Sequence, residues 1–214
     1  MHRKYRFYPF ARVRCFVSAP SFTVMEFDPF IEIMESETVY PVSDDSILLI
    51  RSLNITQGER VLEIGCGSGV VSIHCAKNGC IVTAADINPD AVKTARLNAD
   101  LNFVPMDVVY SDVYENVNGI FDTIVFNLPY LPVEEEGMAE KAWSGGADGL
   151  GPLPRLLRDS KKHLTKDGRI VIVVSSLMDQ KRLNDVLSKY DVTVLGEEPM
   201  FFEKLSVLEI RRSS

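Results

Sequence analysis

Residues 60–69 read RVLEIGCGSG, an apolar run that leads directly into a glycine-rich turn. The branched side chains of Arg60–Ile64 predict a short buried strand. The turn carries three glycines at alternate positions, Gly65, Gly67 and Gly69. Because glycine lacks a Cβ, they permit a tight turn and let a ligand approach main-chain atoms closely. A helix is predicted from Val70 to about Asn78, and a glycine-rich turn between a strand and a helix indicates a nucleotide-type ligand.

Strands and helices alternate along the rest of the chain. Further strands are predicted at 80–85, 104–110, 121–126, 169–174, 192–195 and 205–210, and helices at 44–53, 70–78, 89–100, 152–164 and 179–189. This alternation predicts an α/β fold, a doubly wound sheet with helices on both faces. The connection 196–204 is too short for a crossover helix, so the last two strands are predicted to form an antiparallel hairpin.

The composition is that of an ordinary globular protein. The 214 residues fit one domain, with 46% apolar and 25% charged residues, and the net charge of −7 argues against electrostatic binding of nucleic acid. No apolar run approaches the roughly 18–20 residues that span a bilayer. The basic start Met1–Arg6 is interpreted as a poorly ordered leader, with an arm that touches RNA as the alternative. Four cysteines without a C-x-x-C pair predict reduced thiols of a cytoplasmic protein rather than a zinc site or disulfides: Cys15, Cys66, Cys75 and Cys80.

Acidic residues stand where the predicted strands end. Asp86 ends the second strand, where a carboxylate can take the two hydroxyls of a ribose, and Asn88 already caps the following helix. For Asp112, after the third strand, a cofactor contact and a simple turn are both open. Glu63 precedes the glycines, where it would repel a pyrophosphate but suits the ammonium tail of a sulfonium cofactor. The chain has neither the G-x-G-x-x-G pattern of a dehydrogenase nor a P-loop lysine after this turn.

The fourth strand ends in an amide, a proline and a phenol. Asn127 can both accept and donate hydrogen bonds, Pro129 stiffens the backbone, and Tyr130 offers a stacking face. In an open parallel sheet the ligand crevice lies at the carboxyl ends of the strands. The segment therefore suits a substrate with a planar amide or amino group.

Two other stretches leave more than one interpretation. Asp45 and Ser46 lie either in a capped helix start, which composition favours, or at the rim of a ligand pocket. Residues 131–151 form a long predicted loop next to the site, and such loops are usually functional. Within it, Trp143 either walls the pocket or anchors the loop, and Glu134–Glu136 is typical of a solvated face.

Taken together, these motifs resemble a known family. The pattern E-x-G-x-G-x-G at 63–69, Asp86 and the terminal hairpin resemble the class I AdoMet-dependent methyltransferases, which implies a Rossmann-like seven-stranded sheet. Residues 127–130, Asn-Leu-Pro-Tyr, resemble the N-P-P-Y signature of members that methylate amino groups. Residues 39–46, 142–149 and 203–208 are similar to the HemK-related protein-glutamine methyltransferases, and more closely to their archaeal and eukaryotic branch.

The resemblance covers about residues 39–211, so we expect a leader at 1–38 and a methyltransferase domain at 39–214. It implies contacts to S-adenosyl-L-methionine from Ser46, Glu63, Gly65, Gly67, Gly69, Asp86, Asp112, Val113 and Asn127. It implies that Asn127, Pro129 and Tyr130 carry catalysis and that no metal takes part. Leu128 departs from the family pattern, which has proline there, and the turn is expected to be less rigid.

The activity implied is methylation of a glutamine side-chain amide, at the Gly-Gly-Gln motif of a translation release factor. The alternatives are an exocyclic amino group of DNA or RNA, a protein lysine, and a non-catalytic AdoMet-binding scaffold; a dehydrogenase is more distant. The resemblance also implies a small zinc-binding activator subunit and no membrane. In this fold the third strand is expected at the sheet edge, where another chain can pair with it.

Overall fold

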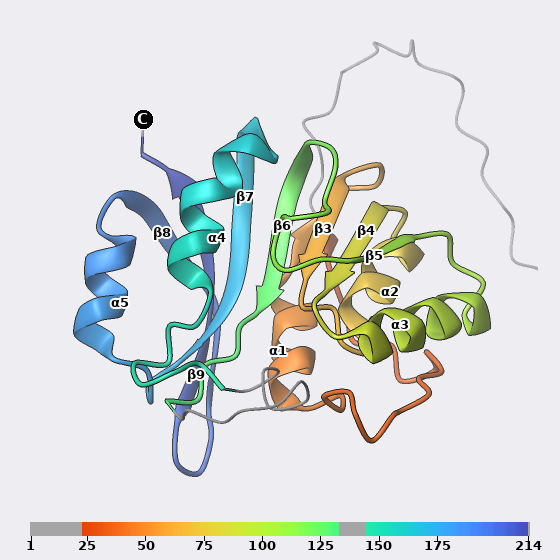
Figure 1. Cartoon of the computed structure of the whole chain (residues 1–214), viewed down its shortest axis with the longest axis horizontal. Helices are drawn as coiled ribbons and strands as arrows, with labels where there is room; N and C mark the ends of the chain where they lie inside the picture. The colour runs from red at the N-terminus through yellow and green to blue at the C-terminus, as the bar shows by residue number, and fades with distance from the viewer. Residues whose placement is uncertain (1–22, 133–143, 214) are drawn as a thin grey trace, which may run out of the picture.

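The computed structural model describes residues 23–132 and 144–213 (Figure 1). Most of the expected leader lies outside the described residues, with Cys15, and so do Glu134–Glu136 and Trp143. Within the described ranges, every helix falls short of the length and apolar character that a membrane span requires.

A seven-stranded sheet with the order β5-β4-β3-β6-β7-β9-β8 forms the centre of the molecule. Its strands are β3 (Arg60–Ile64), β4 (Ile81–Asp86), β5 (Asp107–Tyr110), β6 (Phe121–Asn127), β7 (Leu164–Ser175), β8 (Tyr190–Pro199) and β9 (Lys204–Arg212). The first five run parallel, and β9 runs antiparallel to both β7 and β8. This confirms the predicted doubly wound sheet with its terminal hairpin, and β5 is an edge strand as expected.

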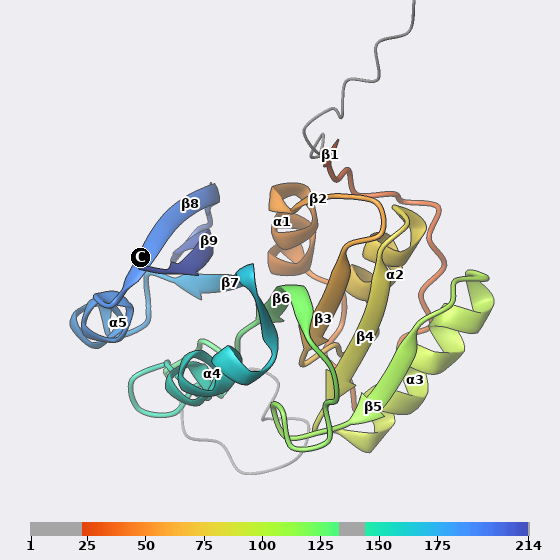
Figure 2. The ribbon, with the colours of Figure 1, turned by 90° about the horizontal axis from the view of Figure 1, so that it is seen from above.

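Helices cover both faces of the sheet (Figure 2). They are α1 (Asp44–Ser52), α2 (Val70–Lys77), α3 (Pro89–Leu101), α4 (Leu153–Asp159) and α5 (Gln180–Leu187), with a 3-10 turn η2 (Ser160–Lys162) after α4. In Figure 2, α1, α2 and α3 lie on one face, and α4 and α5 lie on the other. A two-stranded ribbon that the sequence does not predict joins β1 (Thr23–Val24) to β2 (Asn54–Ile55).

Alternation along β3 divides the core between the two faces. Val61 packs with the cluster under α1 and α2, whereas Leu62 and Ile64 pack with the cluster under α4 and α5. All three are at most 3% exposed. A central strand buried on both sides reads as a nearly continuous apolar run, which is why its sequence predicts it so well.

Apart from the terminal hairpin, the largest differences from the sequence prediction lie at three element boundaries. β5 begins at Asp107 rather than at 104, because residues 102–104 form the turn that closes α3: the Val104 amide donates to the Ala99 carbonyl at 3.1 Å. The helix predicted at 152–164 ends as α4 at Asp159, and β7 already begins at Leu164. Leu164 pairs with Phe121 and the next registered pair on β7 is at 169, so the predicted turn 165–168 bulges out of a continuous strand.

The terminal hairpin is longer than predicted. A register shift between Val194 and Gly196 lets β8 continue to Pro199, and β9 begins at Lys204. The predicted connection 196–204 therefore shrinks to the turn 200–203. The strands extend because residues 196–199 find partners in 204–207 that the hydrophobic pattern alone does not reveal.

The buried side chain of Arg169 on β7 links this strand to β6, to β9 and to residues 54–59. The Arg169 guanidinium lies 2.9 Å from the Glu209 carboxylate and 3.4 Å from that of Glu59, and its side chain is 5% exposed. It also donates to the Thr123 hydroxyl and to the Asn54 carbonyl. Neighbouring strands are thus joined by one charge network.

We expect Arg169→Met to lower the free energy of unfolding by about 3–5 kcal/mol, because it leaves a buried carboxylate without its cation. Urea denaturation measures the change. The matched control is Arg182→Met, which removes an arginine that is 63% exposed and pairs with Asp148. That loss should not exceed about 1 kcal/mol. Equal losses in the two variants would contradict a structural role for the buried network.

Candidate active site

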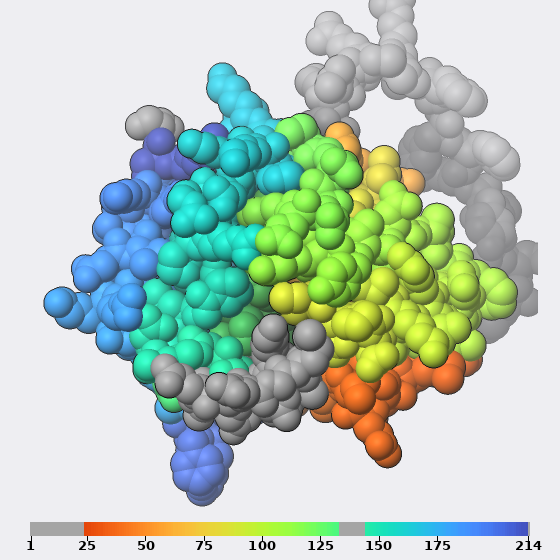
Figure 3. Space-filling model, in the orientation of Figure 1, coloured from red at the N-terminus to blue at the C-terminus, as the bar shows by residue number. Residues whose placement is uncertain are grey.

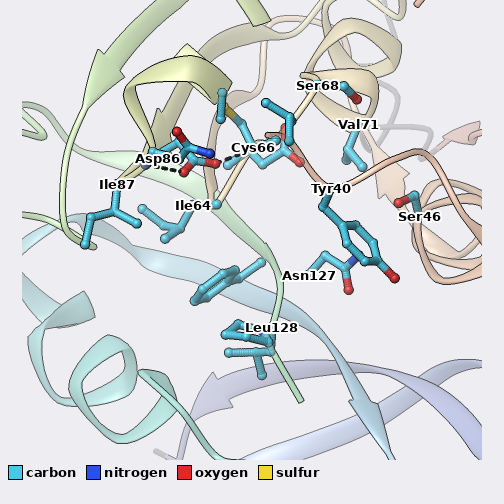
Figure 4. A pocket seen from close by; sticks show the side chains of 18 of the residues that line it. Tyr40, Ser46, Ile64, Cys66, Ser68, Val71, Asp86, Ile87, Asn127 and Leu128 are labelled. Atoms are coloured by element: carbon cyan, nitrogen blue, oxygen red, sulfur yellow. Dashed lines mark hydrogen bonds between the residues drawn. The ribbon is translucent and has the colours of Figure 1, made fainter. Parts of the chain in front are cut away.

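A pocket of about 670 Å³ opens at the carboxyl ends of the parallel strands. It is lined by all but one of the residues expected from the sequence, namely Ser46, Glu63, Gly65, Gly67, Asp86, Asp112, Val113, Asn127, Pro129 and Tyr130. Figure 4 shows Asp86 and Ile87 toward one end of it and Tyr40, Ser46 and Asn127 toward the other. The pocket therefore has separate ends for two parts of a ligand, or for a cofactor and a substrate.

The expected residue that does not line the pocket is Gly69. Its φ of +82° is left-handed, and a Cβ there would lie 3.1 Å from the Cβ of Ala95 on α3. Gly65 has a different role, since a Cβ there would lie 2.7 Å from the Phe126 ring. Gly65 thus keeps the turn close to the end of β6, whereas Gly69 permits the close packing of α3.

Glu63 is buried beneath the glycine turn. Its side chain accepts hydrogen bonds from the Ser72 amide at 2.9 Å and from the Ser72 hydroxyl. Burial raises the pKa of Glu63 to about 8, and the nearby charge of Asp86 acts in the same direction. Because burial disfavours the ionised carboxylate, a cation placed against it would stabilise that charge.

Asp86 connects the glycine turn to the start of α3. One carboxylate oxygen accepts from the Gly67 amide at 2.9 Å and the other from the Asn88 amide at 2.8 Å (Figure 4). Burial nevertheless raises the pKa of Asp86. Each oxygen has a further lone pair, so the carboxylate can still accept from a pair of hydroxyls in the pocket.

Asp112 and Val113 follow β5 on the same side of the pocket. Arg155 of α4 donates to the Asp112 carboxylate at 2.8 Å and to its carbonyl at 3.2 Å, which orients this loop. Val113 is 5% exposed with a φ of 52°, a conformation that costs a β-branched residue energy. Arg155 is a positioning residue that no sequence motif indicates.

Asn127, at the end of β6, brings a side-chain amide to the pocket. Its side-chain oxygen Oδ1 is buried and has no hydrogen-bond partner within the described residues. A buried acceptor left without a donor costs free energy, and a ligand N–H would relieve that cost. The atom is therefore suited to hold an amide or amino group.

The backbone after Asn127 is held by packing from two sides. Leu128 is 2% exposed and belongs to the core cluster under α4 and α5. On the other side, a Cβ at Gly145 would lie 2.6 Å from the Pro129 carbonyl oxygen, and one at Gly149 would lie 2.6 Å from that of Tyr130. Core burial of Leu128 and the glycine contacts restrain the segment at the position where the family pattern has its first proline.

Sequence reasoning missed a network that fixes Tyr130. The buried carboxylate of Asp45 accepts from the Tyr40 hydroxyl at 3.3 Å and from the Tyr130 hydroxyl at 3.4 Å. It also accepts from the Ser43 hydroxyl and the Ser46 amide, each at 2.5 Å, so Ser43 does not cap α1 through its side chain. The hydroxyls and carboxylates of residues 43–46 were the available signal, but composition alone favoured a helix cap.

The geometry fits a nucleoside cofactor with a cationic group. The glycine turn leaves main-chain atoms accessible, Asp86 can accept from ribose hydroxyls, and Glu63 lies where a cation is favoured. The pocket volume lies within the range of about 300–1,000 Å³ that is typical of small-molecule sites. Asn127 lies apart from Asp86 in this pocket, at the position expected for an acceptor substrate (Figure 4).

Comparison with known sequences identifies a family. Residues 41–199 match the family described as methyltransferase small domain. A candidate protein N5-glutamine methyltransferase of Methanocaldococcus jannaschii is 40% identical over 181 residues, which cover 81% of this chain and 92% of that protein. The ribosomal RNA small subunit methyltransferase C of Chromohalobacter salexigens is 30% identical over 155 residues, or 72% of this chain and 42% of that protein.

Comparison with solved structures shows the same fold. The Mtq2-Trm112 complex of E. cuniculi, described as responsible for methylation of the eRF1 translation termination factor, includes a chain that aligns with a TM-score of 0.66. The alignment covers 82% of this chain and 99% of that chain, at 20% sequence identity.

The buried Glu63 gives a pH-dependent stability that can be measured. Its pKa rises from 4.5 to about 8 on folding, so its contribution is complete below 4.5 and is lost as the pH rises through about 8. We expect the free energy of unfolding of the ligand-free protein to fall between pH 5 and pH 8. The fall should exceed that of Glu63→Gln by at least about 1.4 kcal/mol, the equivalent of one pKa unit.

Glu63→Gln is a matched variant because a glutamine oxygen can still accept from Ser72. Denaturation at several pH values provides the measurement. Parallel pH profiles for the two proteins would show that Glu63 is already ionised in the folded state.

Proposed function

The chain belongs to the methyltransferase small domain family and is an AdoMet-dependent N-methyltransferase; from this premise we propose that it methylates the side-chain amide nitrogen of a glutamine in a translation release factor. The observation that carries the proposal is the buried Oδ1 of Asn127, for which residues 23–132 and 144–213 supply no hydrogen-bond donor. Support for the glutamine comes from the M. jannaschii relative, and support for the release factor from the activity described for the E. cuniculi complex.

The proposed chemistry places a poor nucleophile in line with a reactive methyl group. S-adenosyl-L-methionine, when bound by residues such as Glu63 and Asp86, supplies that methyl on a sulfonium. The lone pair of an amide nitrogen is delocalised, so orientation and proximity provide most of the acceleration. Asn127 Oδ1 and a backbone carbonyl beside Pro129 would accept the two N–H bonds of the substrate amide.

Tyr130 completes the proposed clamp. Its ring would pack on the plane of the substrate amide, and the hydrogen bond to Asp45 holds the ring in place. Burial raises the pKa of Tyr130, and the charge of Asp45 adds to this effect. The phenol therefore stays neutral at physiological pH and acts by packing rather than as a base.

The second candidate is methylation of an exocyclic amino group in RNA. The specific observation in its favour is the 30% identity to the ribosomal RNA methyltransferase, since a base amino group is also planar and could use the same Asn127 acceptor. The net charge of −7 argues against it. The alignment covers 42% of that relative's length.

Labelled AdoMet distinguishes the candidates. We expect label to enter the release factor when it is offered together with histone, RNA and DNA. Label entering only nucleic acid would contradict the glutamine proposal, and label in histone would favour lysine. AdoMet binding without transfer to any acceptor would indicate a scaffold.

Asn127→Ala tests the residue on which the proposal depends. We expect kcat to fall by at least about a hundredfold, the effect of removing one well-placed polar group from an active site. AdoMet affinity, measured by calorimetry, should remain largely unchanged. Asn184→Ala, at an exposed position of α5, is the control. Equal loss of AdoMet binding and transfer would mean that Asn127 acts on the cofactor alone.

We further propose an activator subunit, supported by the two-protein complex described for E. cuniculi, and we assign its contact to the β5 edge. β5 is an edge strand, and it lies with α3 at one side of the molecule (Figure 1). Large apolar side chains are exposed there: Leu97, Leu101, Phe103 and Tyr110. An uncovered apolar edge of this kind invites strand addition from a partner. The resemblance to the HemK-related branch suggests that this partner is small and binds zinc.

Coexpression with a candidate activator tests this surface. We expect Phe103→Asp, at a position that is 94% exposed, to abolish copurification without unfolding the chain. Val194→Asp changes a side chain that is 53% exposed on β8, the edge strand at the opposite side of the sheet, and it serves as the control. A purified chain that is soluble and fully active on the release factor alone would contradict the need for a partner.

A further inference from the structure

The turn between β8 and β9 lies on the pocket side of the sheet. Because β9 runs antiparallel to β7, its first residues lie beside the carboxyl end of β7, at the edge where the parallel strands open into the pocket. Figure 1 shows the hairpin reaching past this edge, and Figure 3 shows the same blue segment projecting from the lower surface. Nothing in the methyl-transfer chemistry described above uses this projection.

The projection carries two adjacent aromatic side chains in solvent. Phe201 is 91% exposed and Phe202 is 85% exposed. Their rings contact each other edge to face, with centroids 4.5 Å apart. Adjacent exposed aromatics present an apolar surface that marks interaction sites in proteins of this kind.

The backbone that presents these rings is well tied. The Met200 amide donates to the Glu203 carbonyl at 2.7 Å, which closes the turn. At its base, the Lys204 amide donates to the Ser176 hydroxyl and the Ser176 amide donates to the Lys204 carbonyl, each at 2.9 Å. The Met200 side chain packs against the core. A partner would therefore meet a pre-organised pair of rings and not a loop that must first be ordered.

The turn is also connected to the end of the pocket where the acceptor nitrogen is expected. Glu203, next to Phe202, accepts a hydrogen bond from the Ser175 hydroxyl at the end of β7. Burial and the charge of Asp45 raise the pKa of Tyr130, and the charge of Glu203 acts on it in the same direction. The pKa of Tyr40 is raised as well, mainly by burial and by the charge of Asp45, and the charge of Glu203 adds to this effect. Both tyrosines line the pocket.

The charges around the rings favour a polypeptide over a nucleic acid. Glu197 and Glu198 lie at the end of β8, and Glu203 lies in the turn. The Lys204 ammonium is paired with the Glu197 carboxylate at 2.7 Å, so it is not free to bind phosphate. A phosphate backbone would be repelled here, whereas an apolar patch bordered by basic side chains would be attracted.

We propose that Phe201 and Phe202 dock the protein substrate, by entering an apolar recess with a basic rim on the folded domain that carries the acceptor glutamine. The inference rests on the proposed function for the identity of the site. It assigns the selection of a folded substrate to the hairpin and the chemistry to the pocket. A short peptide that spans the acceptor would reach the pocket but not the hairpin.

Steady-state kinetics with the full chain and its activator test the proposal. We expect the double variant Phe201→Ser, Phe202→Ser to raise KM for the folded release factor at least about tenfold, as loss of an interface hot spot does. The kcat, the AdoMet affinity and the KM for a Gly-Gly-Gln peptide should stay within about twofold, well below a hot-spot effect. The double variant with tyrosine at both positions keeps the aromatic surface and should restore the lower KM.

Val192→Ser is the matched control, because it removes a half-exposed apolar side chain from the opposite end of β8. An unchanged KM for the folded release factor in the serine variant would overturn the docking proposal while leaving the proposed function intact. If the protein methylates a different folded protein and the serine variant raises KM for that one, docking is supported and the release factor is wrong. Label entering only RNA, or no acceptor at all, would overturn both.

Discussion

The parallel register of β4, β3 and β6 is the constraint on which the site depends. Ile64 pairs with Ala85 on one side and with Phe126 on the other, so the next residues of all three strands emerge at one edge. Glu63, Asp86 and Asn127 come from separate parts of the sequence and meet there because of this register. A slip by one residue would turn each side chain to the opposite face of the sheet.

Two kinds of support keep these strand ends in place. Near the glycine turn the support is polar: Asp86 accepts from the amides of Gly67 and Asn88 and so joins β4 to the turn and to α3. At the Asn127 end it is mainly packing, since Leu128 is anchored in the core and Gly145 lies against the Pro129 carbonyl. A clamp that relies on orientation needs this rigidity more than it needs a strong base.

The departure at Leu128 illustrates how the family pattern and the fold interact. Proline restricts a backbone locally, whereas a leucine restricts it only if its side chain has a core to enter. Leu128 has that core under α4 and α5. The expectation of a less rigid turn considered the backbone alone, and the contacts of Leu128, Gly145 and Gly149 show restraints that lie outside the motif.

The sequence by itself determined the order and type of the main elements, the edge position of the third strand and ten of the residues that line the pocket. Buried central strands and glycine turns can be recognised from a few neighbouring residues. A motif that directly follows such a strand must lie at the carboxyl edge of a parallel sheet, where the ligand crevice is expected. Only the tertiary structure decided where β7 begins, that Gly69 packs on α3, and that Asp45 holds Tyr40 and Tyr130. These features are contacts between distant residues, such as the 85 positions that separate Asp45 from Tyr130, and no local pattern encodes such a contact.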